Sequence, residues 1–61
     1  MNIKEFRVRN NLSQSELAEK LKVTQGLISQ WENNETLPKV SALVQMADLF
    51  NCSVDDLVKE G

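Results

Sequence analysis

Small and polar side chains that could bind a partner share one face of a helix predicted within residues 24–34. Ile28 and Trp31 lie three residues apart and form the buried stripe of this helix. At about 100° per residue, the opposite face carries Gly26, Ser29, Gln30 and Asn33. An amide such as that of Gln30 combines a donor and an acceptor, the pair that matches N7 and N6 of adenine. The alternative for such a glutamine is a solvated place on a helix surface.

Two capping signals predict the helices that position this face. Ser13-x-x-Glu16 is a capping box, in which the serine hydroxyl accepts from a backbone N–H and the glutamate reaches back to the serine N–H. The helix that begins there has a narrow apolar stripe of Leu17, Ala18 and Leu21. Val23 points inward from the turn, and Thr24 is a favourable N-cap for the next helix. Residues 13–34 are therefore predicted to form two short helices joined by a tight turn.

The same stretch resembles a known family. The similar motifs are Ser13-Gln14, Glu16-Leu17-Ala18 with Lys20-Leu21, Val23-Thr24-Gln25, ISQWENN at residues 28–34, IKEFR at residues 3–7, Pro38, and MADLFNCSVDDL at residues 46–57. Together they are similar to the helix-turn-helix domains of the lambda-repressor and Cro type. The resemblance implies an all-α, compact five-helix domain over residues 1–61. Its second and third helices would form the helix-turn-helix.

The resemblance also implies a function, the sequence-specific binding of double-stranded DNA by a transcriptional regulator. Members of this family are most often repressors. A homodimer would place the third helix of each subunit in successive major grooves about 34 Å apart and so occlude an operator. The residues expected to contact DNA are Gln14, Thr24, Gln25, Gly26, Leu27, Ser29, Gln30, Asn33, Asn34, Thr36 and Lys39.

Three of these positions leave alternatives open. Gln25 could read a base or brace the DNA backbone. Leu27 could meet a thymine methyl group or serve as a leucine at the edge of the core. Gly26 either removes one base contact or lets the helix approach its partner closely.

The first helix is predicted to begin with a cap at Asn2-x-x-Glu5 and to run to about Asn10. Arg7 lies on its inner edge, and the resemblance assigns Glu32 as the buried partner that such an arginine requires. A solvated Arg7 without a specific partner is the alternative.

Helix ends form a second set of expectations from the resemblance. The family usually has glycine at the turn positions occupied here by Asn11, Lys22, Asn34 and Asn51. Asparagine tolerates a left-handed backbone better than other residues with a β-carbon. Lys22 is the departure, because a β-carbon in that conformation costs about 1 kcal/mol.

The fourth helix is predicted to start near Val40. Its residues expected to close the core are Val40, Leu43, Val44, Ala47 and Phe50, with Met46 at the margin. Leu49 is expected to point outward and to form dimer contacts with Val54 and Val58. Cys52 is interpreted as a core residue rather than a reactive thiol. Ser53-x-x-Asp56 resembles a second capping box and predicts a short fifth helix.

Composition limits the other function classes. With 41% hydrophobic and 26% charged residues, the 61-residue chain suits one small globular domain. One cysteine and no histidine make an internal disulfide impossible and a metal site improbable. Without histidine or tyrosine, the parts of a catalytic triad are missing, so no enzyme activity and no cofactor are expected. No signal peptide, membrane segment or small-molecule ligand is expected, and the expected location is cytoplasmic.

The net charge of −2 fits a DNA-binding domain poorly, since such domains are usually basic. The acidic residues concentrate toward the C-terminus, which leaves room for a locally positive face. The alternative is that this domain is a protein-interaction module, such as an antitoxin, an adaptor or an anti-repressor, with weak DNA binding.

Overall fold

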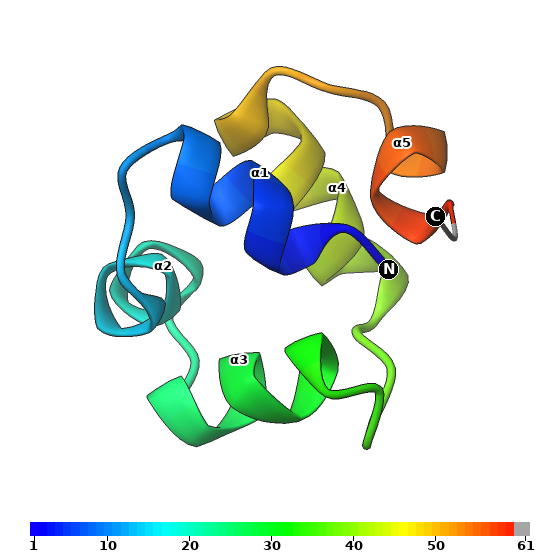
Figure 1. The fold of residues 1–61 in the computed structure, drawn as a ribbon. Coiled ribbons are helices and arrows are strands. Elements are labelled where there is room, and N and C mark those ends of the chain that lie inside the picture. The colour runs from blue at the N-terminus through cyan, green and yellow to red at the C-terminus, as the bar shows by residue number, and fades with distance from the viewer. Residues whose placement is uncertain (60–61) are drawn as a thin grey trace.

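The computed structural model describes residues 1–59, which form five helices and no strand. The helices are α1 (Ile3–Arg9), α2 (Gln14–Leu21), α3 (Gln25–Glu32), α4 (Val40–Phe50) and α5 (Val54–Val58). In Figure 1, α2 lies at the left, α3 crosses below it, and α4 runs behind α1. The predicted all-α, five-helix architecture is confirmed, with α2 and α3 as the helix-turn-helix. None of the helices in residues 1–59 is long and apolar enough to cross a lipid bilayer.

Side-chain caps start three of the helices as predicted. In α2, the backbone N–H of Glu16 donates to Ser13 Oγ at 3.0 Å, and the N–H of Ser13 donates to Glu16 Oε1 at 2.9 Å. The Thr24 hydroxyl accepts from the N–H of Leu27 at the start of α3. Ser53 and Asp56 form the second complete capping box, at the start of α5. Each cap satisfies N–H groups that a helix leaves without an internal partner.

Four helices end in the same way. The residues with positive φ are Asn11 (57°), Lys22 (58°), Asn34 (60°) and Asn51 (56°), the four predicted turn positions. The residue after each donates its backbone N–H to the carbonyl five positions earlier: Leu12 to Arg7, Val23 to Ala18, Glu35 to Gln30, and Cys52 to Ala47. This 6→1 bond is the one that characterises a Schellman motif. Lys22 is the only one of the four that is not asparagine, so it alone carries the full free-energy cost of a β-carbon in a left-handed backbone.

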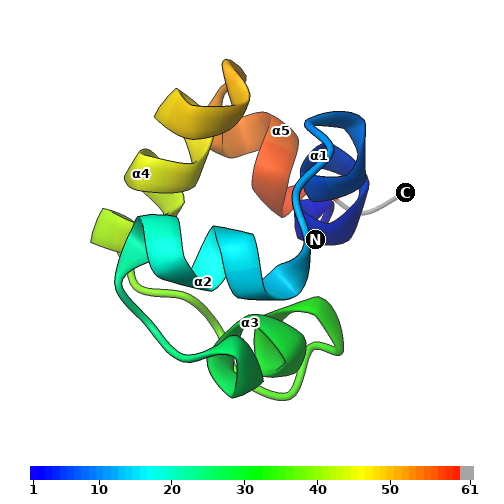
Figure 2. The same ribbon diagram turned by 90° about the vertical axis from the view of Figure 1, so that its left-hand side faces the viewer.

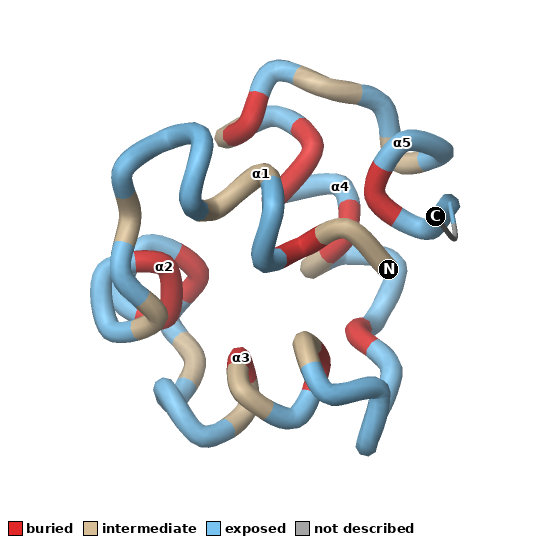
Figure 3. Tube along the Cα trace, viewed as in Figure 1, coloured by how far each residue is buried: buried red, intermediate tan, exposed pale blue. Residues whose placement is uncertain are grey.

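The core draws residues from all five helices, and Figure 3 shows the buried segments turned toward the centre of the molecule. Its members are Ile3, Leu17, Ala18, Leu21, Ile28, Trp31, Leu43, Met46, Ala47, Phe50 and Leu57. The predicted stripes of α2 and α3 are confirmed. Val23 packs against the same cluster from the turn between them.

The prediction for α4 was wrong in part. Val40 is 74% exposed and Val44 is 46% exposed, whereas Met46 is fully buried. The buried stripe is therefore Leu43, Met46, Ala47 and Phe50, which have the spacing i, i+3, i+4 and i+7 of one helix face. Leu49, expected to point outward, is half-buried and packs against the core.

The predicted cap at Asn2 is also wrong. Asn2 precedes α1, but its side chain makes no cap hydrogen bond. Its Nδ2 instead donates to the carbonyl of Asp56 at 3.0 Å, and its backbone N–H donates to the carbonyl of Leu57 at 2.8 Å. Both bonds join the start of the chain to α5, so a tertiary contact has replaced the local one.

Candidate nucleic-acid interface

Helix α3 packs mainly against α2 and leaves its other side open, as the turned view in Figure 2 shows. The buried stripe of Ile28 and Trp31 fixes the rotation of α3 on the core. Gln25, Gly26, Gln30 and Asn33 are consequently exposed, and Ser29 is half-buried. These five residues define the outer face of α3, and the structure brings them together on one side of one helix.

An ion pair ties the end of α3 to α1. Arg7 Nε donates to Glu32 Oε2 at 2.7 Å, and Arg7 Nη2 lies 3.4 Å from Glu32 Oε1. Arg7 Nη1 donates to the carbonyl of Leu12 at 2.8 Å, which adds the turn after α1 to the same group. The two side chains are only 11% and 5% exposed. A pair this well shielded from water holds α3 in a defined position relative to α1.

A chain of amide hydrogen bonds extends this ion pair to the beginning of α3. Gln14 Nε2 donates to Glu32 Oε1 at 3.0 Å, and Gln25 Nε2 lies 3.5 Å from Gln14 Oε1. Ser15 Oγ donates to Gln25 Oε1 at 2.9 Å. Both ends of α3 are thus linked through side chains at the start of α2. We call Arg7, Glu32, Gln14, Gln25 and Ser15 the polar network.

Ser15 was not predicted as part of the site, because nothing in its neighbouring sequence distinguishes it from a solvated serine. Its role depends on the turn between α2 and α3, which brings residues ten and eleven positions apart within hydrogen-bond reach. Gln14, which was expected to contact DNA, is half-buried, and its side chain is hydrogen-bonded to both Glu32 and Gln25. It therefore does not extend freely toward a phosphate.

The remaining polar residues of this region are held more loosely. Thr36 Oγ1 lies 3.5 Å from Gln30 Oε1, and Asn33 Nδ2 lies 3.4 Å from Ser29 Oγ. Bonds of this length are weak, so these side chains can exchange them for a partner's groups at little cost. Asn34, exposed in the turn that ends α3, adjoins this loosely held set.

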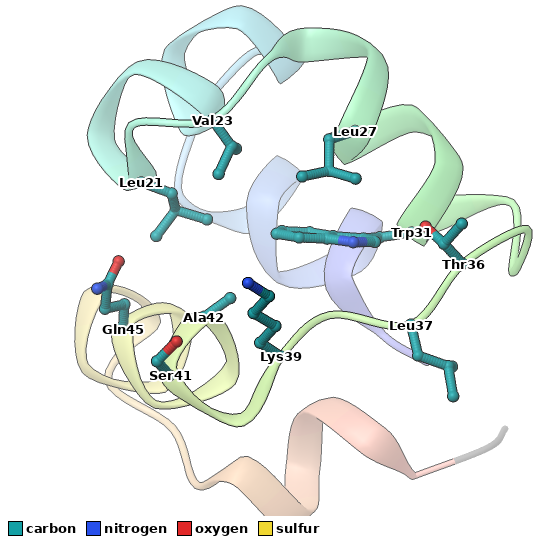
Figure 4. A pocket seen from close by; sticks show the side chains of 10 residues that line it. All are labelled: Leu21, Val23, Leu27, Trp31, Thr36, Leu37, Lys39, Ser41, Ala42 and Gln45. Carbon is teal, nitrogen blue, oxygen red and sulfur yellow. The ribbon is translucent and has the colours of Figure 1, made fainter.

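The structure bears differently on the alternatives that the sequence left open at Gly26 and Leu27. A β-carbon at Gly26 would meet no atom within 4 Å, so packing within the domain does not require a glycine there. Leu27 packs against the core and points toward Val23 and Trp31 rather than along the outer face (Figure 4). Its place matches the core-edge alternative.

The predicted dimer residues do not lie on this face. Leu49 and Val54 are half-buried against the core, and Val58 of α5 is 37% exposed. The most exposed aliphatic side chains lie in the loop before α4 and at its first residue: Leu37 is 75% exposed and Val40 is 74% exposed.

Among residues 1–59, two titratable groups have clearly shifted pKa values. The backbone N–H of Ser13, followed by its hydroxyl, lowers the pKa of Glu16. Burial, followed by the charge of Asp56, raises the pKa of the Cys52 thiol, which keeps it protonated and less nucleophilic. Among residues 1–59 there is no group of three acidic or cysteine side chains that could hold a metal ion.

Comparison with known proteins agrees with this geometry. A family model of helix-turn-helix domains matches residues 3–57. The HTH-type transcriptional activator BcrR of Enterococcus faecalis is 32% identical over 56 residues, which are 92% of this chain and 28% of that protein. The chain therefore spans little more than a quarter of the length of this relative. The match over nearly all of its length shows that the chain belongs to the helix-turn-helix family of the Cro/C1 type.

Proposed function

We propose that this domain binds duplex DNA sequence-specifically through the outer face of α3 and thereby regulates transcription. The observation that carries the proposal is the polar network, which fixes α3 at both ends while its outer face stays free. An α-helix with its side chains is about 10–12 Å across, so α3 fits a major groove about 12 Å wide. Membership of a family of DNA-binding regulators supports the same conclusion.

The proposed contacts divide into two kinds. Gln30, loosely held and exposed, reads a base edge, and adenine is the base that its amide matches. Gln25 is oriented by Ser15 and Gln14 and presents its amide at the first turn of α3. The groups proposed to bind the DNA backbone are Gln14, Thr24, Asn33, Asn34, Thr36 and Lys39. Ser29 and Gly26 line the face between them.

For the direction of regulation, we propose repression by occlusion of a promoter. A bound domain blocks polymerase when its site overlaps the promoter, whatever else it contacts. The relative BcrR is named an activator, so activation from a site beside the promoter is the alternative. The position of the binding site distinguishes the two.

We also propose that a second copy of the chain covers the aliphatic residues exposed at α4 and α5. Leu37, Val40 and Val44 come within eight residues of one another, and Val40 and Val44 are one helical turn apart. Exposed apolar patches of this kind mark interaction sites. This surface shares Val58 with the predicted dimer contacts, whereas Leu49 and Val54 are half-buried against the core.

Selection from a random pool of duplex DNA at low salt tests the proposal. We expect enrichment of a two-fold-symmetric motif with half-sites about 34 Å apart, bound less tightly as salt rises. Because the net charge is −2, the salt dependence should be shallow compared with that of a basic domain. Failure to enrich any motif would contradict DNA reading and favour the protein-interaction alternative, which the negative charge supports.

A further inference from the structure

A groove separate from the outer face of α3 runs between that helix, the loop after it and the start of α4. It encloses about 310 Å³ and includes residues from the end of α2 and the turn that follows. This volume lies at the lower end of the range for small-molecule sites, about 300–1,000 Å³. Figure 4 shows Leu21, Val23, Leu27 and Lys39 gathered around Trp31, whereas Leu37 points away from the hollow.

The walls of the groove are mostly apolar. Leu21, Val23 and Leu27 close one side, and Ala42 of α4 lies opposite. The indole of Trp31 lies across the middle of the hollow (Figure 4). Trp31 is only 4% exposed, so its ring forms the floor of the groove rather than part of its rim. A ligand seated here would contact aliphatic side chains and one aromatic face.

The lining carries a single charge. Lys39 is its only ionisable residue, and Figure 4 shows the Lys39 side chain reaching over the groove with its ammonium group toward the hollow. Within residues 1–59, no carboxylate forms an ion pair with Lys39. The Thr36 hydroxyl and the Gln45 amide add hydrogen-bonding groups at the edge. An apolar hollow with one unpaired cation complements a molecule that has an apolar body and one negative head group.

We propose that this groove binds a small amphipathic carboxylate, with its apolar body on Trp31 and its carboxylate on Lys39. No small-molecule ligand was expected from the sequence, and the residues of the groove come from four separate segments that only the fold brings together. The site has a consequence that rests on the proposed function. Lys39 and Thr36 are also proposed DNA backbone contacts, so an anion held by Lys39 would compete with a phosphate and weaken DNA binding.

The chain contains its own reporter for this proposal, since Trp31 is the only tryptophan. Titration with octanoate should change the Trp31 emission in a saturable manner, and the neutral isostere octanamide should bind about tenfold more weakly. Lys39→Met should remove that preference, because it keeps the aliphatic stem and deletes the charge. Lys4→Met, which changes an exposed lysine of α1, is the matched control and should behave like the wild type.

Two further measurements separate this site from unspecific association. Ala42→Phe should fill the groove and abolish binding of both probes, while its circular dichroism shows that the helices are retained. Backbone NMR shifts on octanoate addition should centre on the loop 33–39 and the start of α4. No saturable emission change, equal affinity for both probes, or shifts centred elsewhere would overturn the proposal.

The proposed function can fail separately. The fluorescence titration contains no DNA, so octanoate binding without any selected DNA motif would leave the groove proposal standing. When a motif is selected, octanoate should weaken the wild-type complex and leave that of Ala42→Phe unchanged. A selected motif without octanoate binding would overturn only the groove proposal.

Discussion

The surface formed by α2 and α3 differs from the one formed by α4 and α5 in the way its exposed side chains are held. Within residues 1–59, the hydrogen bonds recorded between side chains join α1, α2, α3 or the loop after α3. On α4 and α5 the exposed side chains include Val40, Val44 and Val58. The α2–α3 surface is polar and internally connected, whereas the α4–α5 surface carries exposed valines among polar and acidic side chains.

This difference suggests two kinds of partner. Side chains that are already oriented lose less conformational freedom on binding, which favours specific recognition by the α2–α3 surface. Burying exposed valines against another apolar surface releases free energy by removing apolar area from water, which favours association through α4 and α5. The proposed DNA contact and the proposed self-association would thus use different parts of the five helices.

Among the changes that test this comparison, breaking the polar network should have the largest effect on the stability of the fold. Glu32→Gln removes the charge that Arg7 requires, and we expect the free energy of unfolding to fall by about 3 kcal/mol. Urea denaturation followed by circular dichroism measures it. Glu35→Gln is the matched control, because Glu35 is exposed and should tolerate the same change. Equal midpoints for both variants would show that the ion pair contributes nothing to stability.

The helix ends of the two halves sharpen the comparison. Lys22 ends α2 and Asn51 ends α4, both with a left-handed backbone. Lys22→Gly should raise the free energy of unfolding by about 1 kcal/mol, because glycine has no β-carbon to strain. Asn51→Gly should raise it by less, since asparagine already tolerates this conformation. Thermal unfolding of both variants tests this order, and a loss of stability in Lys22→Gly would contradict it.

Gly26 tests whether the outer face of α3 is shaped for a partner. Gly26→Ala should stabilise the fold by about 0.5–1 kcal/mol, because helix propensity rises and the added methyl group has open space. We expect DNA affinity to fall nonetheless, since the methyl group stands where the helix would approach DNA. Ser41→Ala on α4 is the control and should not change DNA affinity. A stabilised Gly26→Ala variant with undiminished DNA binding would rule out close approach at this position.

The smallest expected effect concerns pH and the cap of α2. The folded-state pKa of Glu16 lies below its ordinary value of 4.5, so its charge stabilises the fold above that pH. This contribution should be lost as pH falls through the lower folded-state pKa. The melting temperature of the wild type should therefore exceed that of Glu16→Gln at neutral pH, and the gap should close in acid. A gap that is the same at both pH values would contradict this account, and Glu19→Gln controls for removing any one charge.

The α2–α3 half could be predicted from sequence because its signals are local. A capping box, a threonine cap and narrow apolar stripes leave one choice of buried face for each helix. The turn positions were predictable through family resemblance, and Lys22 shows that the backbone conformation is kept even where the residue is unfavourable.

The α4 half was less predictable because its sequence allows two buried stripes. Leu43, Ala47 and Phe50 belong to both stripes. One stripe adds Val40 and Val44, and the other adds Met46. Only the positions of the other helices decide between them. Tertiary geometry also explains Asn2, whose side chain bonds to the carbonyl of Asp56, 54 residues away.

The same limit applies to the candidate interface. Its exposed residues follow from helix periodicity, but the hydrogen bonds that orient them cross between helices. The hydrogen bonds of Ser15 to Gln25 and of Gln14 to Glu32 depend on how α3 packs against α2, which the local sequence does not specify.

The central claim, that the outer face of α3 reads DNA, is tested most directly at Gln30. Affinity for the selected duplex and for versions with single base-pair changes should be measured for the wild type, Gln30→Ala and Gln45→Ala. We predict that Gln30→Ala loses about 1–3 kcal/mol of binding free energy and relaxes the preference at one base pair. Gln45→Ala, an exposed glutamine of α4, should bind like the wild type. Unchanged affinity and unchanged base preference in Gln30→Ala would contradict the claim.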